Sequence, residues 1–401
     1  MGPREKVAVS PFRLDGLYQD IPESVVVYDS TLRDGEQMPG VAFVPAVKLE
    51  IARALDEVGV PEIEAGFPSV SVSEAAAVRQ VAQAGLDADI LCLARLRRDD
   101  IDAAADAGVD LVLLFVPASP IQLKVKLKKT VDEVLPDITR VTEYARDRGL
   151  RVGFSTEDST RANLADLVRI YRAAVAAGAE RVGITDTVGC STPNGTAQLV
   201  QYVKRALGGF PVSVHLHNDF GLATANALAG VLAGAGFVTT TVNGIGERAG
   251  NVPLQPFVMA AELLYGIPTG VDPTGLQALS ELVAARSGVA VHPNAPVAGS
   301  NVFSHESGIH VKAVMEDPRT YEPYPPELVG QRRTLALGKH TGEAHVKAVL
   351  SGQGVRLTEE QVDRVTASLK ELGERQGAVT FAEFWEIVSR VTGQAHRVRS
   401  R

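Results

Sequence analysis

Residues 149–186 read GLRVGFSTEDSTRANLADLVRIYRAAVAAGAERVGITD. The stretch begins with a short strand-like run at 149–155 and ends with a second such run at 180–186. Between them, residues 164–177 place apolar side chains at helical spacing, so the stretch predicts one strand–helix–strand unit. A crossover helix of this kind joins two parallel strands, which makes the unit a building block of α/β folds.

The same pattern recurs along the first two thirds of the chain. Eight strands are predicted, at 24–29, 61–66, 88–94, 109–116, 149–155, 180–186, 211–217 and 236–242. The stretches between them are rich in Ala, Leu and charged residues, with helical spacing at 46–58 and 131–148. Eight strands alternating with helices favour a closed (β/α)8 TIM barrel, although strand counting alone leaves an open doubly wound sheet as the competing fold.

Polar side chains stand at or just past the C-terminal ends of these strands. They are Asp29, Glu64, Glu157, Asp186, His215 and Asn243. A barrel brings the C-terminal strand ends together in one mouth, where active sites of this fold lie. An open sheet has no single crevice that would gather all six, so the polar ends favour the barrel.

The composition of the 401 residues limits the class of protein. With 45% hydrophobic and 22% charged residues, the chain fits a globular protein. The net charge of −8 is spread along the chain, so no nucleic-acid partner is expected. The only cysteines, Cys92 and Cys190, exclude a disulfide framework and favour the reducing cytoplasm. We expect no signal peptide, and no apolar run comes near the roughly 20 residues that span a bilayer, so no membrane partner is expected either.

The pattern changes after about residue 266. A helix at 273–286 leads into a Pro-, Gly- and Asn-rich linker, a polar His-containing stretch, and two helices at 358–375 and 381–391. We therefore predict four parts: an N-terminal extension (1–23), a TIM-barrel catalytic domain (24–265), a linker with a small subdomain (266–330) and a helical subdomain (331–401).

His215 and His217 are the sharpest signal of a metal site. Residues i and i+2 of a strand point to the same side, so both imidazoles can face one ion inside the barrel mouth. For this pair alone, it is an equally good interpretation that both histidines are hydrogen-bonded structural residues at a strand end. The stretch DSTLRDGEQ at 29–37 adds Asp34, and an Asp with two His suits Mg, Mn, Zn or a similar divalent ion. Arg33 beside such an ion could stabilise an oxyanion or clamp a carboxylate, whereas the alternative is a charged capping turn.

Three further stretches have both a functional and a plain reading. The loop GIGERAGN at 244–251 could cradle an anion or simply be flexible. Glu157 could act as an acid or base, or could pair with Arg161. A run of four lysines, Lys124, Lys126, Lys128 and Lys129, could attract a phosphate-bearing cosubstrate, although such runs are usually solvated.

In the tail, His305, His310 and Tyr321 are by default surface residues, unless the segment folds over a barrel mouth.

Taken together, these motifs resemble the 2-isopropylmalate synthase/homocitrate synthase family, a metal-dependent, acyl-CoA-condensing group of TIM barrels. The resemblance spans residues 25–342. It rests on DSTLRDGEQ, IEAGFP, FSTEDSTR, DTVGCSTP, HLHNDFGLA, NGIGERAGN, FSHESGIH and GKHTG, in the family's order. It implies a Claisen condensation of acetyl-CoA, as cosubstrate, with a 2-oxo acid, followed by thioester hydrolysis that releases CoA and a 2-hydroxy di- or tricarboxylic acid.

The resemblance also implies roles for individual residues. Metal ligation is implied for Asp34, His215 and His217, with Asn251 beside the ion. Catalysis is implied for Arg33, and activation of acetyl-CoA for Glu157, His310 and Tyr321. Substrate contacts are implied for Gln37, Thr187 and Gly246, and we add the strand-end residues Asn243 and Arg95 as candidates. In the family, the His and Tyr come from the neighbouring subunit, so a homodimer with shared active sites is expected, with the segment 266–330 acting as a lid over the partner's site.

The substrate is left open by two departures from the family pattern. Gln122 stands after the fourth strand where many members have His, and LCLARLRR at 91–98 lacks the His that homocitrate synthases often carry. Arg95 is our guess for a partner of a distal carboxylate. We expect no leucine-sensing domain after the tail, and therefore no feedback inhibition by that route.

The tail and the missing sensing domain favour homocitrate-type chemistry with 2-oxoglutarate. The 2-isopropylmalate type, with 2-oxoisovalerate, and the citramalate type, with pyruvate, remain alternatives. A CoA-thioester lyase on the same barrel would carry a catalytic Cys in the loop 243–251, which has none. A non-catalytic barrel would be expected to lack a metal ligand, and all three are present.

Overall fold

The computed structural model describes residues 7, 8, 10 and 21–395. The chain forms two compact units, Phe12–Val291 and His292–Arg401, the second of which includes the described residues before position 11. The predicted four-part division has its boundaries elsewhere, at 23, 265 and 330, and stays a prediction. The first unit runs on past residue 265 because the helix that ends at Ser287 packs with the barrel.

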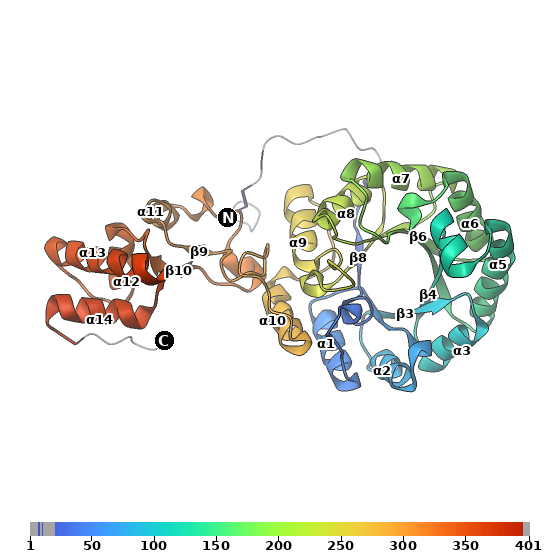
Figure 1. Cartoon of the computed structure of the whole chain (residues 1–401), viewed down its shortest axis with the longest axis horizontal. Coiled ribbons are helices and arrows are strands. Elements are labelled where there is room, and N and C mark those ends of the chain that lie inside the picture. The colour runs from blue at the N-terminus through green and yellow to red at the C-terminus, as the bar shows by residue number, and fades with distance from the viewer. Residues whose placement is uncertain (1–6, 9, 11–20, 396–401) are drawn as a thin grey trace. The chain divides into compact units, whose positions relative to one another are not determined.

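Eight parallel strands close into a barrel in sequence order, with the last strand paired to the first (Figure 1). They are β1 (Val26–Asp29), β2 (Glu62–Gly66), β3 (Asp89–Arg95), β4 (Leu111–Pro117), β5 (Arg151–Glu157), β6 (Arg181–Asp186), β7 (Val212–Leu216) and β8 (Phe237–Thr240). Each lies within two residues of its predicted position. The predicted TIM barrel is therefore confirmed, and the open sheet is excluded.

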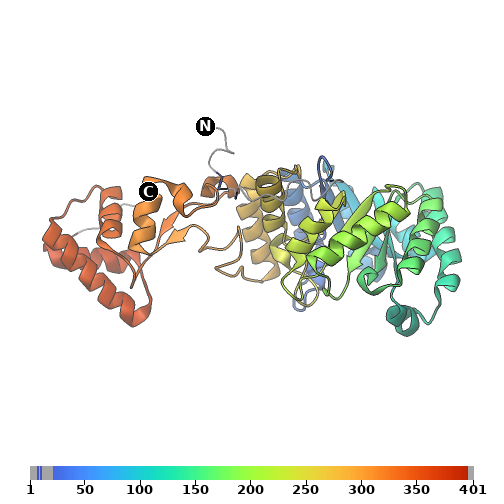
Figure 2. The ribbon, with the colours of Figure 1, turned by 90° about the horizontal axis from the view of Figure 1, so that it is seen from above.

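Helices surround the strands on the outside of the barrel, as Figures 1 and 2 show. The main ones are α1 (Pro45–Glu57), α2 (Val72–Ala82), α3 (Arg98–Ala107), α5 (Val131–Asp147), α6 (Leu164–Ala176), α7 (Pro193–Ala206), α8 (Ala223–Leu232), α9 (Leu254–Met259) and α10 (Leu276–Ser287). Short helical turns fill the loops at the mouth, among them η2 (Gly35–Gln37), α4 (Pro120–Gln122), η4 (Leu123–Leu127), η5 (Ser159–Arg161) and η6 (Val242–Gly244).

Local sequence explains where these helices begin. Thr130 and Glu133 form a reciprocal capping box at the start of α5, and the Asn163 side chain accepts two backbone N–H bonds at the start of α6. Pro45 occupies the first turn of α1, where its missing N–H is not needed. These signals place helix starts within one residue of the predictions.

A buried ion pair lies inside the barrel, near the N-terminal ends of its strands. Arg181 Nη1 donates to Glu62 Oε1 at 2.7 Å, and both side chains are buried. The Arg181 guanidinium also lies over the rings of Phe237 and Tyr28, at 4.4 and 5.3 Å from their centroids. The pair therefore fills the end of the barrel opposite the mouth.

We expect Arg181→Met to lower the free energy of unfolding by about 3–5 kcal/mol, because it leaves the Glu62 carboxylate buried without a counter-charge. Urea denaturation measures this change. The double variant Arg181→Met, Glu62→Met should recover most of the loss, since neither charge then remains buried. A single-variant loss below about 1 kcal/mol, the range of an exposed ion pair, would contradict the prediction.

The second unit is small and mainly helical, as predicted. Its helices are α11 (Gly308–Glu316), α12 (Glu343–Gly352), α13 (Glu359–Gln376) and α14 (Phe381–Thr392). Two pairs of very short strands tie it together: β9 (Ser304–His305) with β10 (Thr334–Leu335), and β11 (Leu337–Gly338) with β12 (Ala378–Val379). Its own core includes Leu369, Phe384 and Trp385. Strands of two residues show no periodicity, which is why the sequence did not predict them.

Across the described residues, no helix combines the length and the apolar character that crossing a bilayer requires.

Candidate active site

Asp34, His215 and His217 come together at the barrel mouth. Asp34 lies in the loop after β1, His215 lies in β7, and His217 follows directly, bridged to Asn251. Asp34 Oδ2 is 3.5 Å from His215 Nε2, which is 3.3 Å from His217 Nε2. One ligand atom from each residue lies within 4.8 Å of the others, and all three are buried. The i, i+2 spacing thus points both imidazoles to one side.

The charge states of these three groups suit a cation. Burial lowers the pKa of His215 to about 3, although the Asp34 carboxylate acts in the opposite direction, and burial also lowers the pKa of His217. Burial acts to raise the pKa of Asp34, but the charge of Arg33 and the two imidazoles more than offset it and hold that pKa below its usual range. Near pH 7 the site therefore offers one carboxylate and two neutral imidazoles, the forms that bind metals.

The surroundings of these ligands also fit a bound divalent ion. Asn251 Nδ2 donates to Asp34 Oδ1 at 2.8 Å, while Asn251 Oδ1 and His217 Nδ1 are buried and lack a hydrogen-bond partner among the described residues. Gly246 lies directly against the pair, since a Cβ there would be 2.1 Å from Asn251 Nδ2 and 2.9 Å from Asp34 Oδ1. The site thus contains two buried polar atoms without a hydrogen-bond partner, and there is no space for a side chain at Gly246.

Arg33 is held between two carboxylates at the edge of this site. Its Nη1 donates to Asp34 Oδ2 at 2.6 Å, and its Nε donates to Glu64 Oε1 at 2.8 Å. Glu64 is fully buried in the middle of β2, and its Oε2 accepts from Ser30 Oγ at 2.5 Å. The sequence marked Glu64 only as a polar strand end. Its partnership with Arg33 depends on which way the two side chains point across neighbouring segments, and the predicted order of strands does not give that direction.

A cavity of about 290 Å³ opens over the site. Among the residues that line it are seven predicted ones: Arg33, Asp34, Gln37, Glu157, Thr187, His215 and His217. The sequence assigned no site role to several others, among them Phe67, Leu93, Leu113, Phe115 and Arg248. The cavity wall is therefore charged near the ligands and apolar along β3 and β4.

Glu157 faces the cavity, but its ionic partner is not the expected one. Lys126 Nζ donates to both Glu157 oxygens, at 2.6 and 2.7 Å. Arg161 instead pairs with Asp158. The alternative role considered for Glu157, a salt bridge with Arg161, is therefore wrong. Lys126 belongs to the lysine run and lies in η4, a short π-helical turn, from which its side chain lines the cavity.

Thr187 is fixed from two sides at the cavity wall. Its hydroxyl accepts the Asp158 backbone N–H at 2.8 Å, and its carbonyl accepts from Arg248 Nη2 at 2.6 Å. Arg248 also pairs with Asp219 at 2.9 Å. These bonds connect the loops after β5, β6 and β8, so they hold the mouth in shape around Thr187.

Three predicted substrate contacts are absent from the cavity lining: Gly246, which lies against Asn251 and Asp34, and the two strand-end residues Asn243 and Arg95. Asn243 bonds to Gln255 and Ser280, which lie in α9 and α10. Arg95 makes a two-pronged ion pair with Asp100, at 2.7 and 2.8 Å. Asn243 therefore serves the loops around it. Arg95 lines a smaller cavity of about 220 Å³ that shares Phe115, Lys126 and Glu157 with the main one, and its contact with substrate stays a prediction. Position at a strand end is a weak predictor when the strand is followed by a tight turn.

His310 and Tyr321 lie together in the second unit. Their ring centroids are 4.1 Å apart, and the Tyr321 side chain is 46% exposed. Nearby, Glu322 is buried and accepts bonds from Arg333 and His305. The two rings thus form an exposed pair on an anchored segment. Their action on the active site of a partner stays a prediction.

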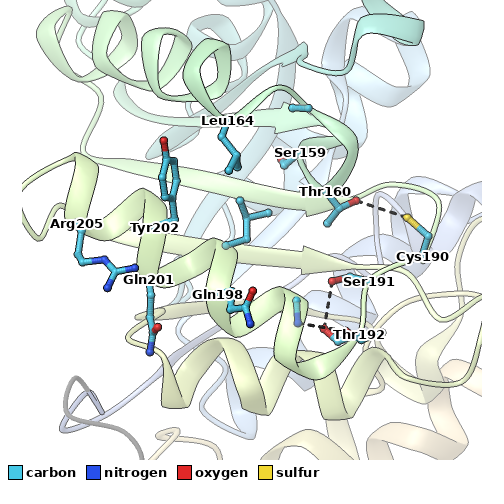
Figure 3. A pocket seen from close by; sticks show the side chains of 13 residues that line it. Ser159, Thr160, Leu164, Cys190, Ser191, Thr192, Gln198, Gln201, Tyr202 and Arg205 are labelled. Atoms are coloured by element: carbon cyan, nitrogen blue, oxygen red, sulfur yellow. Dashed lines mark hydrogen bonds between the residues drawn. The ribbon is translucent and has the colours of Figure 1, made fainter.

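A larger hollow, of about 760 Å³, lies between α6 and α7 (Figure 3). Thr160, Cys190, Tyr202 and Arg205 are among the residues that line it, and Figure 3 shows the hydrogen bond between Thr160 and Cys190 at its edge. Every predicted site residue belongs to the described part of the chain, and none of them lines this hollow. The chemistry predicted for the mouth therefore does not extend into it.

Comparison with known proteins agrees with this fold. The family model described as HMGL-like matches residues 24–283, and the model described as homocitrate synthase post-HMGL domain-like matches residues 297–377. The chain belongs to the HMGL-like family, among the homocitrate and 2-isopropylmalate synthases. The predicted resemblance is confirmed.

Individual relatives cover nearly the whole chain. The chain is 52% identical to homocitrate synthase AksA of Methanopyrus kandleri, over 93% of this chain and 94% of that protein. It is 47% identical to a probable 2-isopropylmalate synthase of Ignicoccus hospitalis, over 95% and 96% of the two chains. A solved structure of a hydroxymethylglutaryl-CoA lyase from Pseudomonas aeruginosa matches with a TM-score of 0.62 at 23% identity, covering 68% of this chain and 96% of that one. This last likeness concerns the fold alone.

Proposed function

We propose that this chain condenses acetyl-CoA with a 2-oxo acid, and that the acid is 2-oxoglutarate, as in a homocitrate synthase. The observation that carries the proposal is the buried set of Asp34, His215 and His217 beside Arg33 in the barrel mouth. The high identity to homocitrate synthases across both units supports the choice of reaction.

Asp34, His215 and His217 would hold a divalent ion, Mg, Mn or Zn, with Asn251 beside it. Bound there, the ion would supply a Lewis acid and a template for the oxygens of the 2-oxo acid. Arg33 places its positive charge next to Asp34, where it can offset negative charge on the substrate carboxylate or on the oxygen of the reacting ketone. Thr187 and Gln37 also line the cavity, and we assign Thr187 to the substrate carboxylate and Gln37 to the substrate and CoA sites.

The condensation needs a base for the methyl group of acetyl-CoA. The Glu157 carboxylate lies in the cavity, and we assign it to this step together with His310 and Tyr321. Loss of a methyl proton leaves an electron pair that forms the new C–C bond to the keto carbon, and the former keto oxygen then takes up a proton. Water next hydrolyses the thioester, and CoA leaves as the free thiol. Because His310 and Tyr321 are assigned to a partner's site, the proposal includes a homodimer, and the reducing cytoplasm is its expected location.

One observation in the cavity favours an alternative 2-oxo acid, 2-oxoisovalerate. Arg95, the candidate partner for a distal carboxylate, is bound to Asp100, whereas Leu93, Leu113 and Phe115 line the cavity wall. An apolar wall suits the branched side chain of 2-oxoisovalerate, so 2-isopropylmalate synthesis is the alternative. Besides Arg33, the cations that line the cavity are Lys126 and Arg248, and each is likewise paired with a carboxylate, Glu157 and Asp219 respectively.

We expect free thiol to appear when acetyl-CoA is mixed with the Mg- or Mn-loaded protein and 2-oxoglutarate. The same assay with 2-oxoisovalerate and pyruvate measures the preference, and omission of the 2-oxo acid gives the background of simple hydrolysis. A preference for 2-oxoisovalerate would overturn the choice of 2-oxoglutarate alone. Absence of thiol release with every acid would overturn the synthase proposal.

A further inference from the structure

A buried lysine binds both the loop that carries Arg33 and the strand that carries Glu64. Lys48 lies in the first turn of α1, and its side chain is fully buried. It is not among the described residues that line the cavity. A buried ammonium is costly unless it is paired and hydrogen-bonded, so its surroundings explain its presence.

The Lys48 ammonium is surrounded by five oxygens from three segments. Its Nζ lies 2.9 Å from Leu32 O, 3.4 Å from Ala65 O, 2.7 Å from a Glu36 oxygen, and 2.7 and 2.8 Å from the two Glu74 oxygens. Leu32 and Glu36 belong to the loop after β1, Ala65 lies near the end of β2, and Glu74 lies in α2. One cation therefore joins the loop after β1, strand β2 and helix α2.

The contacts of Lys48 lie next to both members of the Arg33–Glu64 ion pair. Leu32 precedes Arg33, and Ala65 follows Glu64, so the backbone next to each member of the ion pair is bound to the same ammonium. Glu74 extends the link, because its Oε1 also accepts the Phe67 N–H at 3.0 Å. Gly66 makes room for it, since a Cβ at Gly66 would be 2.0 Å from Glu74 Oε1.

We propose that Lys48 is a positioning residue that sets the spacing between the loop after β1 and strand β2, and thereby the placement of Arg33 and Asp34 at the metal site. This inference rests on the proposed function for its catalytic consequence. Its structural consequence is independent of the substrate, because Asp34 follows Arg33 in the loop that Lys48 holds. Small displacements of positioned groups can lower a rate by roughly 100-fold.

The test uses the full-length protein and the triple variant Lys48→Met, Glu36→Gln, Glu74→Gln. The two glutamines keep the carbonyl oxygens that accept from Phe43 and Phe67, and they avoid leaving carboxylates without a cation. We expect the Kd for Mn²⁺, measured by calorimetry, to rise by about 10-fold or more, and kcat to fall by about 10- to 100-fold. The variant Glu74→Ala, which removes one anchor only, should give a smaller rise in the same Kd.

Ile138→Ala is the matched control for lost stability. Ile138 is fully buried in α5 and does not line the cavity, so its truncation should lower the melting temperature while leaving kcat and the Mn²⁺ Kd unchanged. If the triple variant or Glu74→Ala folds and binds Mn²⁺ as the wild type does, the positioning role is overturned. If the triple variant does not fold, Glu74→Ala decides. Failure of the wild type to release CoA would overturn the proposed function, but the Mn²⁺ comparison would still test Lys48.

Discussion

Replacing His217 with alanine is expected to abolish metal-dependent turnover. His217 Nε2 lies 3.3 Å from His215 Nε2, and the variant leaves two of the three ligands that gather around one point. Loss of a partner that merely orients a ligand costs about 10- to 100-fold in metal affinity, and loss of a ligand itself should cost more than that. Calorimetric titration with Mn²⁺ measures the affinity, and thiol release from acetyl-CoA measures the turnover.

His292→Ala is the control for this variant, because His292 is an exposed histidine of the second unit. It should bind Mn²⁺ and turn over as the wild type does. Circular dichroism must show that the His217 variant keeps its fold. A folded His217→Ala protein with full metal-dependent activity would remove His217 from the site.

Replacing Arg33 with glutamine is expected to lower kcat/KM by about 100- to 1,000-fold, the range for loss of one preorganised donor to a developing oxyanion. Glutamine keeps a hydrogen-bonding amide but loses the charge that lies between Asp34 and Glu64, at 2.6 and 2.8 Å. The variant also leaves the buried Glu64 carboxylate without its cation, so we expect a lower melting temperature as well. Steady-state kinetics with the preferred 2-oxo acid measures the effect on catalysis.

Arg151→Gln is the matched control for Arg33→Gln. Arg151 also bridges two carboxylates, Asp89 and Glu180, but it does so at the first residue of β5, at the opposite end of the strand from Glu157. Its loss should leave kcat/KM within a few-fold of the wild type. Equal kinetic losses in the two variants would mean that Arg33 acts through general stability alone.

The barrel and its ligand set could be predicted because both depend on local sequence. Alternating strands and helices give the fold, and the spacing of His215 and His217 gives a shared direction on one strand. Asp34 could be added because its loop is far too polar for a simple turn. In each case the informative residues lie within a few positions of one another.

Other features required the three-dimensional arrangement. Glu64 meets Arg33 because of the direction in which the two side chains point across neighbouring segments, and Lys48 joins segments up to 26 residues away along the chain. Asn243 was placed at the site by its strand end, yet a left-handed backbone with φ of 60° and bonds to Ser280 direct it elsewhere. The short strands β9 to β12 are too brief to leave a periodic pattern.

The central claim is that this barrel forms a carbon–carbon bond between acetyl-CoA and 2-oxoglutarate. The most direct measurement is mass spectrometry of the product made from acetyl-CoA with two ¹³C atoms in its acetyl group, 2-oxoglutarate and the Mn-loaded protein. We expect a tricarboxylic acid that carries both labelled carbons, formed with the wild type and not after removal of the ion with a chelator. Labelled acetate as the only product, with 2-oxoglutarate unchanged, would show hydrolysis without condensation and would contradict the claim.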